Sequence, residues 1–228
     1  MGAALVIQHA AVEGVGRFAE WFPAHGIELH VLHPYAGEPL PSAVSDDALI
    51  VMGGPMGACD DADVPWLAQA KLLMADAVAR RVPTLGVCLG AQLLAVATGG
   101  KVEPGGAGPE LGLDTVEITV PDQLFDLGEL PVVQWHFDTV TALPTDAILL
   151  GSSARYAVQA FRVGESAWGV QFHVEATADM VRAWARADRL DEDALAGPVT
   201  VAADRLAAAG ARLAGRFAEL VVERAGAH

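Results

Sequence analysis

The feature that most constrains the fold is a short segment in which two glycines flank a cysteine. In Thr84-Leu-Gly-Val-Cys-Leu-Gly-Ala-Gln92, Gly86 and Gly90 lie two positions before and two positions after Cys88. A short apolar strand leads into the cysteine, and an apolar helical stretch over residues 92–97 follows it. Because glycine has no side chain, the backbone can turn sharply from the strand into the helix. The pattern predicts a nucleophile elbow, which holds the middle residue out over the end of a sheet.

A cysteine in such an elbow has the surroundings of a reactive thiol. Cys88 would face the N-terminus of the following helix, and the positive end of that helix dipole stabilises a thiolate over a thiol. The thiolate is the nucleophilic form. The alternative is a buried structural cysteine in a parallel strand, which is a common role. The two flanking glycines favour the catalytic interpretation.

The first hundred residues alternate between strands and helices. Short apolar strands are expected at residues 4–7, 27–32 and 48–52, and helices at 18–25 and 64–81, where apolar residues recur at helical spacing. Alternation of this kind is typical of an α/β fold whose parallel strands are joined by right-handed crossovers. We therefore expect a doubly wound, mostly parallel sheet.

The second half has a different pattern. Residues 113–120, 157–163 and 168–174 alternate apolar and polar side chains with a period of two, and glycine and proline lie between them. This predicts a mixed or antiparallel extension of the sheet. After Ala176 the pattern becomes helical, so the fold is expected to end in C-terminal helices.

The expected domain organisation follows from these helices. Residues 1–190 are predicted to form the α/β domain, and residues 191–228 a helical extension packed on it. The stretch 190–198 is the expected loop. Apolar residues over 206–221 share one helical stripe, which favours packing on the core over self-association. A monomer and a homodimer are both compatible with this stripe.

Composition argues against several classes of function. The formal net charge is −15 with only 14 Lys and Arg residues, which argues against nucleic acid and anionic membranes as partners. No apolar run approaches the about 18 residues of a membrane span, and the N-terminus lacks the basic start of a signal peptide. The two cysteines, Cys59 and Cys88, form no disulfide framework. We expect a reduced, cytoplasmic enzyme.

No residue pattern indicates a metal or another cofactor. The early histidines have no spacing to Cys59 that fits a metal site. The acidic run Asp60-Asp61-Ala-Asp63 precedes a predicted helix, whose positive N-terminus accounts for it. No G-x-x-x-x-G-K-[ST] phosphate loop occurs in the sequence.

A candidate base for the cysteine lies in the segment Trp168-Gly-Val-Gln-Phe-His-Val-Glu175. Side chains alternate faces along a strand, so Gln171, His173 and Glu175 are expected on one face. A carboxylate beside a histidine holds the imidazole in one tautomer and stabilises its cationic form. Alone, His173 would more often be a structural strand histidine. Together with Cys88 in an elbow, it is interpreted as the general base.

Two backbone segments are candidates for an oxyanion hole. When a thiolate attacks an amide carbon, negative charge develops on the carbonyl oxygen and requires donors already in place. The Leu89 N–H follows the nucleophile directly, and the Gly53-Gly54-Pro55 turn lies at the carboxyl end of its own predicted strand. On their own, the two glycines are explained equally well by an ordinary turn that ends a strand.

Taken together, these segments resemble the class I (triad) glutamine amidotransferases, most closely the stand-alone subgroup that is similar to the amidotransferase domain of GMP synthase. The resemblance covers roughly residues 4 to 176, with the segments in the family's order. The matching segments are Val51-Met-Gly-Gly-Pro-Met56, Gly86-Val-Cys-Leu-Gly-Ala-Gln92 with Gly99-Gly100, His136-Phe-Asp-Thr-Val140 ahead of Leu143-Pro144, and Gly169-Val-Gln-Phe-His-Val-Glu175.

The resemblance implies a role for each matching residue. Cys88 would attack the side-chain amide of glutamine, His173 would relay protons, and Glu175 would orient His173. The amides of Gly54 and Leu89 would bind the oxyanion. The residues implied in contacts with the substrate are Gly53, Gln92, Trp135, His136 and Phe137.

Three departures from the family pattern lie near these residues. Val174 follows the histidine where proline is commoner, which removes no catalytic group. Trp135 replaces a residue that is often small, so the substrate pocket is expected to be narrower or differently capped. The stretch 53–63 is longer than in domains of the GMP synthase type.

Three functions remain open at this point. The first is a glutaminase that passes ammonia to a separate synthetase or simply releases it. The second is a γ-glutamyl peptidase, which would share the elbow and the triad. The third is a catalytically silent regulatory protein of a biosynthetic partner, against which the intact Cys88, His173 and Glu175 argue.

Overall fold

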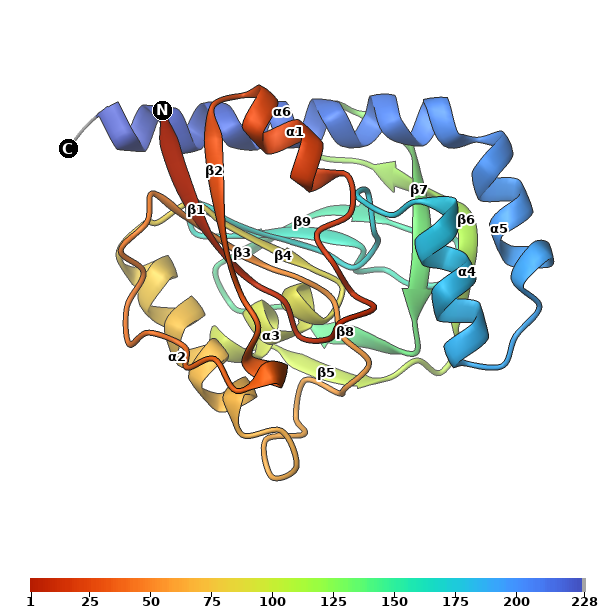
Figure 1. Ribbon diagram of the computed structural model, residues 1–228, viewed down its shortest axis with the longest axis horizontal. Helices are drawn as coiled ribbons and strands as arrows, with labels where there is room; N and C mark the ends of the chain where they lie inside the picture. The colour runs from red at the N-terminus through yellow and green to blue at the C-terminus, as the bar shows by residue number, and fades with distance from the viewer. Residues whose placement is uncertain (227–228) are drawn as a thin grey trace.

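The computed structural model describes residues 1–226 and has one large sheet between two layers of helices (Figure 1). The sheet has nine strands in the order β2-β1-β3-β4-β11-β10-β9-β6-β7, and β5 and β8 form a separate two-stranded sheet. The strands are β1 (Gly2–Ile7), β2 (Ile27–Leu32), β3 (Ala48–Val51), β4 (Thr84–Val87), β5 (Lys101–Pro104), β6 (Glu110–Ile118), β7 (Gly128–His136), β8 (Asp138–Ala142), β9 (Ala147–Ser152), β10 (Ala160–Val163) and β11 (Ala167–Val170).

The large sheet has a parallel half and an antiparallel half. The pairs among β2, β1, β3, β4 and β11 are all parallel, whereas the pairs from β11 through β10, β9 and β6 to β7 are all antiparallel. The predicted doubly wound sheet with an antiparallel extension and C-terminal helices is therefore confirmed. The helices are α1 (Phe18–Ala24), α2 (Trp66–Ala79), α3 (Leu89–Ala97), α4 (Ala178–Ala187), α5 (Glu192–Val201) and α6 (Ala203–Gly226), with a short 3-10 helix at Pro34–Ala36.

Alternating side chains of the parallel strands build two cores. In β1, Ala4 and Val6 face the core under α1 and α6, whereas Leu5 and Ile7 face the core under α2 and α3. Because helices cover both faces, the central strands consist almost wholly of apolar residues. Figure 1 shows α1 and α6 above the sheet and α2 and α3 below it.

The C-terminal stripe is buried within the chain. Leu213, Phe217 and Val221 of α6 lie in the upper core, and the Phe217 ring lies 6.0 Å from Phe22 and 6.4 Å from Trp168 between centroids. A third apolar cluster joins α4, α5 and β7. The predicted extension covers residues 191–228, of which 192–201 form α5 and 203–226 form α6, and 227–228 lie outside the described residues.

Two expected boundaries are wrong. The stretch 190–198 is not a loop, because α5 begins at Glu192 and runs through Pro198. Asp191 caps this helix by accepting hydrogen bonds from the N–H groups of residues 193 and 194, and burial of apolar side chains against β6 and α4 outweighs the missing proline N–H. The strand predicted over 168–174 ends at Val170.

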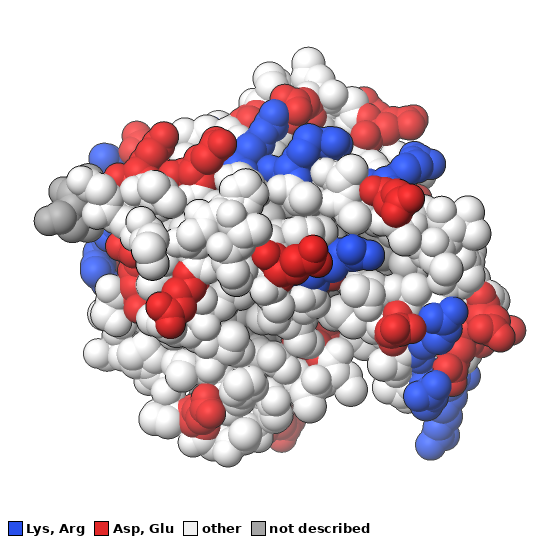
Figure 2. Space-filling view, turned by 45° about the horizontal axis from the view of Figure 1, so that its top comes forward, with Lys and Arg blue, Asp and Glu red and all other residues white. Residues whose placement is uncertain are grey.

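The surface carries mixed charge. On the face shown in Figure 2, Lys and Arg side chains lie beside acidic ones and form no continuous basic surface. Among residues 1–226, no helix combines the length and the apolar composition that crossing a bilayer requires.

Candidate active site

Strand β4 turns directly into helix α3 at Cys88. The residue has φ 51° and ψ −107°, a left-handed conformation that glycine adopts readily and other residues rarely do. The Cys88 N–H donates to the carbonyl of Val170 at 2.8 Å, and the Gln92 N–H donates to the carbonyl of Cys88 at 3.1 Å. Strain of this kind costs on the order of 1–3 kcal/mol and persists because the surrounding packing enforces it.

The two flanking glycines allow the turn to pack closely. A Cβ on Gly86 would lie 2.5 Å from the carbonyl carbon of Gly90, because the strand and the helix touch there. A Cβ on Gly90 would overlap the carbonyl oxygen of Val51 in the neighbouring strand β3. Both contacts are with backbone, which cannot move aside without disturbing the sheet.

We expect Gly90→Ala to destabilise the fold by about 3 kcal/mol or more, since the added methyl group displaces the backbone of β3. Chemical denaturation followed by circular dichroism measures the change. Gly106→Ala is the control, because Gly106 is exposed with open space around it and no positive φ, and there alanine should change the stability by less than about 0.5 kcal/mol. Equal stability of the Gly90 variant and the wild type would contradict the packing described for the elbow.

His173 and Glu175 form a buried pair behind the cysteine. The Nδ1 atom of His173 lies 2.7 Å from Glu175 Oε1, and both side chains are 1% exposed. Although β11 ends at Val170, His173 stays attached to the sheet because its backbone N–H and carbonyl both bond to Val133 of β7. The indole of Trp184 covers the imidazole, with 4.7 Å between the ring centroids.

The charge state of His173 depends on its neighbours. Burial by itself lowers the pKa of the imidazole, but the negative charges of Glu175 and Cys88, together with hydrogen bonds to both, hold that pKa well above its ordinary value. Because Nδ1 is bonded to Glu175, the other ring nitrogen is the one available to Cys88.

Gly53 is the point at which these segments meet. The position that a Cβ would occupy on Gly53 lies 3.0 Å from His173 Cε1 and 3.6 Å from Cys88 Cβ. The thiol of Cys88 also donates to the carbonyl of Trp135 at 3.5 Å, and the Gln171 side-chain amide approaches the sulfur at 3.7 Å. A cysteine and a histidine far apart in the chain are thus brought together.

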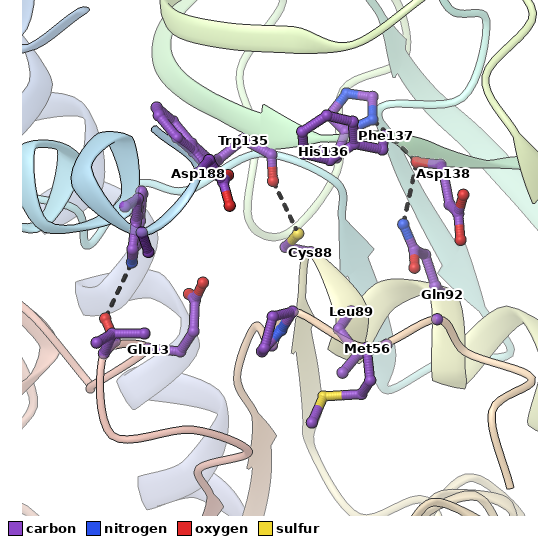
Figure 3. A pocket seen from close by; sticks show the side chains of 16 residues that line it. Glu13, Met56, Cys88, Leu89, Gln92, Trp135, His136, Phe137, Asp138 and Asp188 are labelled. Carbon is purple, nitrogen blue, oxygen red and sulfur yellow. Dashed lines mark hydrogen bonds between the residues drawn. The ribbon is translucent and has the colours of Figure 1, made fainter. Parts of the chain in front are cut away.

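A cavity of about 300 Å³ opens over Cys88 (Figure 3). It is large enough for a small ligand. Gly53, His173 and Glu175 do not line it. The residues singled out from the sequence that line it are Gly54, Cys88, Leu89, Gln92, Trp135, His136 and Phe137. Among residues 1–226, no group of three or more His, Cys, Asp and Glu side chains is arranged to hold a metal ion.

Comparison with known proteins identifies the family. The family model described as glutamine amidotransferase class-I matches residues 24–182. The chain belongs to this family. Its members are cysteine-dependent amidohydrolases, and Cys88 lies at the elbow between β4 and α3.

Relatives of known name agree with this membership. A glutamine-hydrolysing GMP synthase from Bacteroides fragilis is 40% identical over 99 residues, which are 42% of this chain and 19% of that protein. The chain thus spans about a fifth of the length of that relative. A glutamine-hydrolysing GMP synthase subunit from Saccharolobus solfataricus is 32% identical over 153 residues, 66% of this chain and 77% of that protein. A crystal structure of a glutamine amidotransferase from Thermotoga maritima is 29% identical, with a TM-score of 0.87 over 95% of this chain and 98% of that one.

The residues that carry the two candidate oxyanion donors are in contact in the amidotransferase. A Cβ on Gly54 would lie 2.8 Å from Leu89 Cδ2, so the two residues are in contact at the cavity wall. Within residues 1–226, neither the Gly54 nor the Leu89 backbone N–H donates to a backbone carbonyl outside regular structure. The Leu89 N–H is at the first turn of α3, where the helix leaves its amides without partners.

The residues expected to contact the amino acid end of the substrate differ in their hydrogen-bond partners and in their exposure. Gln92 donates to the carbonyl of Asp138 and to Gln171 Oε1, both at 3.1 Å. The Nδ1 and Nε2 atoms of His136 are bonded to the Asp138 carbonyl and to Glu110, so both ring nitrogens are already used. Phe137 is 54% exposed at the rim of the cavity.

Trp135 is turned toward helix α4. Its Nε1 donates to Asp188 Oδ2 at 3.1 Å, and its ring lies 5.6 Å from that of Trp184. Because Trp135 replaces a residue that is often small in the family, the substrate pocket was expected to be narrower or differently capped. The indole forms a wall of the cavity and links β7 to the end of α4.

Four residues around the cavity were given no role in the site from the sequence, although Gln171 was expected on the same strand face as His173. Glu13, Trp184 and Asp188 line it from the loop after β1 and from α4, and Gln171 lies beneath the sulfur. The only signal for Glu13 was its position after the carboxyl end of a parallel strand, where ligands of α/β folds bind. The sequence contains no such signal for Trp184 and Asp188, because their position beside the cavity depends on how α4 packs.

Proposed function

We propose that this amidotransferase hydrolyses the side-chain amide of glutamine through a thioester on Cys88 and releases ammonia. The observation that carries this proposal is the convergence of Cys88 and the His173–Glu175 pair around Gly53, beneath a cavity that opens over the sulfur. Nucleophile, acid–base group and orienting carboxylate are the parts that acyl transfer requires.

The first half-reaction forms the thioester. The Cys88 thiolate attacks the amide carbon, and the carbonyl oxygen becomes an oxyanion. Gly54 and Leu89 are in contact at the cavity wall, and their N–H groups are the donors we assign to the oxyanion. The imidazolium of His173 then gives its proton to the amide nitrogen, the C–N bond breaks, and ammonia leaves.

The second half-reaction restores the enzyme. His173, now neutral, removes a proton from water, and the resulting hydroxide attacks the thioester carbon. A second oxyanion forms in the same position, the C–S bond breaks, and glutamate leaves with the thiolate restored. Glu175 keeps the imidazole in one orientation throughout and stabilises its positive form.

The amino acid end of the substrate is assigned to the side of the cavity opposite the His173 pair. Gln92, Trp135, His136 and Phe137 are the proposed contacts on that side, with Trp135 contributing its backbone, because its indole is held by Asp188 on the other side. His136 contributes its backbone and ring edge, and Gly53 frames the sulfur between the two sides. A flexible γ-glutamyl chain must be held at its far end if its amide carbon is to meet the thiolate.

We assign any synthetase that accepts the ammonia to a separate protein. The Saccharolobus solfataricus relative, which is named as one subunit of a GMP synthase, supports this arrangement. We also assign residues 1–190 to the amidotransferase domain and 191–228 to a helical extension, which the packing of α5 and α6 on the core supports.

The test is an ammonia-release assay on the purified protein with free glutamine, in which glutamate should appear in equal amount. A parallel sample receives a diazoketone analogue of glutamine, which should add to Cys88 in the intact mass and be blocked by excess glutamine. Adduct without turnover would indicate a chemically competent site that needs an activating partner. A protein that releases no ammonia and takes up no analogue would refute the proposal.

A further inference from the structure

The cavity has two unlike sides, and Cys88 lies between them. In Figure 3, Gln92, Phe137 and Asp138 lie on one side of the sulfur, and Glu13 and Asp188 lie on the other. The first side is the one assigned above to the amino acid end of the substrate. The second side is formed by the loop after β1 and the end of α4, and nothing in the proposed reaction has used it.

The second side is where the leaving group must depart. A Cβ on Gly53 would lie 3.0 Å from His173 Cε1 and also 3.0 Å from Glu13 Oε2, so the imidazole edge and the Glu13 carboxylate border the same small space. In the proposed mechanism, His173 gives a proton to the departing nitrogen. Glu13 therefore lies beside the position at which that nitrogen leaves.

Glu13 is a buried carboxylate without a partner. Its side chain lines the cavity, the residue is only 9% exposed, and within the described chain its carboxylate receives no hydrogen bond. Burial raises the pKa of Glu13 to about 7, with the positive charge of His173 opposing the rise and the negative charges of Glu175 and Asp188 adding to it. A cation placed beside a buried carboxylate of this kind stabilises the charged form of that carboxylate.

The surrounding structure holds Glu13 and Asp188 in place. The Glu13 N–H donates to the carbonyl of Ala10 at 3.1 Å, and the Trp184 indole donates to the carbonyl of Val12 at 2.9 Å, which fixes the loop to α4. Asp188 Oδ2 is held by the Trp135 indole at 3.1 Å. Of the described residues that line the cavity, none is Lys or Arg. An anionic leaving group would thus meet two carboxylates and no basic side chain of the wall.

We propose that Glu13 and Asp188 form an anionic leaving-group subsite, which accepts ammonia or a positively charged amine and rejects a leaving group that carries a carboxylate. This inference rests on the proposed function and names its substrate class. Glutamine and γ-glutamyl amides of cationic amines fit the subsite. A γ-glutamyl peptide does not, because its leaving amino acid or peptide brings a carboxylate next to Glu13.

Three γ-glutamyl amides of similar size test the charge preference: γ-glutamyl-ethylenediamine, which is cationic, γ-glutamyl-propylamide, which is neutral, and γ-glutamylglycine, which is anionic. The wild-type enzyme at pH 8, above the pKa of Glu13, should show kcat/KM in the order cation, neutral, anion. The ratio of cation to anion should be at least about 100-fold.

The variants test whether Glu13 causes the preference. Glu13→Gln keeps the shape and removes the charge, and should reduce the cation-to-anion ratio of kcat/KM at least about tenfold. Asp188→Asn retains an acceptor for the Trp135 indole and should also reduce the cation-to-anion ratio, to a smaller extent than Glu13→Gln. It replaces Glu13→Gln as the test if that variant does not fold. Glu20→Gln, on the exposed face of α1, is the control and should leave the ratio unchanged.

The outcomes separate the two proposals. Hydrolysis of γ-glutamylglycine as efficient as that of the cationic amide, or a ratio that Glu13→Gln leaves unaltered, would overturn the subsite while the thioester mechanism stands. Absence of hydrolysis of all three amides and of glutamine, with no analogue bound to Cys88, would overturn the proposed function and the subsite with it.

Discussion

Replacing Cys88 with alanine is expected to lower kcat/KM for glutamine hydrolysis by at least about 10⁴-fold. The sulfur is the only group over the cavity floor that the proposed mechanism allows to form a covalent bond with the substrate, and neither the oxyanion donors nor His173 can replace it. Ammonia release, measured with a coupled glutamate dehydrogenase assay, checks the prediction. The fold should persist, because the elbow is held by backbone contacts of Gly86 and Gly90.

A second substitution at the same position shows that loss of activity is not loss of structure. Cys88→Gly should be equally inactive yet unfold at a higher temperature than Cys88→Ala, since glycine adopts φ 51° without steric strain. The expected difference in the free energy of unfolding is about 1 kcal/mol. If the alanine variant retained wild-type turnover, Cys88 would not be the nucleophile, whatever the stability of either variant.

Glu175→Gln is expected to lower kcat/KM by about 10³–10⁴-fold while leaving the shape of the site intact. The carboxylate at 2.7 Å both selects the tautomer of His173 and stabilises its positive form, and an amide does neither. Glu129→Gln, on the exposed part of β7, is the control and should behave as wild type. Near-normal turnover of the Glu175 variant would show that the pair is structural.

The dependence of kcat/KM on pH provides a second test of the role of Glu175. The pKa of His173 is raised, so the protonated imidazole persists above its ordinary range and is lost as the pH rises through the raised pKa. Activity that needs this proton should therefore fall on the alkaline side. Because Glu175 is one cause of the raised pKa, Glu175→Gln should move the alkaline limb of kcat/KM to lower pH. A limb that stays in place would assign it to another group.

Local patterns predicted the parts of the site that neighbouring residues determine. The turn at Cys88 depends on Gly86 and Gly90, two positions away, and a sharp turn has few alternatives to glycine. The His173–Glu175 contact joins residues only two positions apart, so it formed even though β11 ends at Val170 and the chain bends on both sides of His173. Family membership followed from the order of these short segments.

The helix over Glu192–Val201 shows where local patterns were insufficient. Gly197 and Pro198 favour a break, and the sequence offers no measure of how strongly apolar residues of this stretch are buried. Packing against β6 and α4 decided the outcome. The strands β5, β7, β8 and β9 were not expected for a related reason, since pairing between distant segments is not visible in the periodicity of one of them.

The sequence by itself determined a parallel α/β sheet, an elbow with a cysteine at its tip and a histidine held by a carboxylate two residues away, because each depends on backbone conformation within a few residues. Only the tertiary structure decided that Gly53, Cys88 and His173 meet at one point, and that Glu13 is enclosed beside them without a partner. Burial and proximity between distant segments arise from packing, in this case of α4 and the loop after β1, and packing is a property of the whole chain.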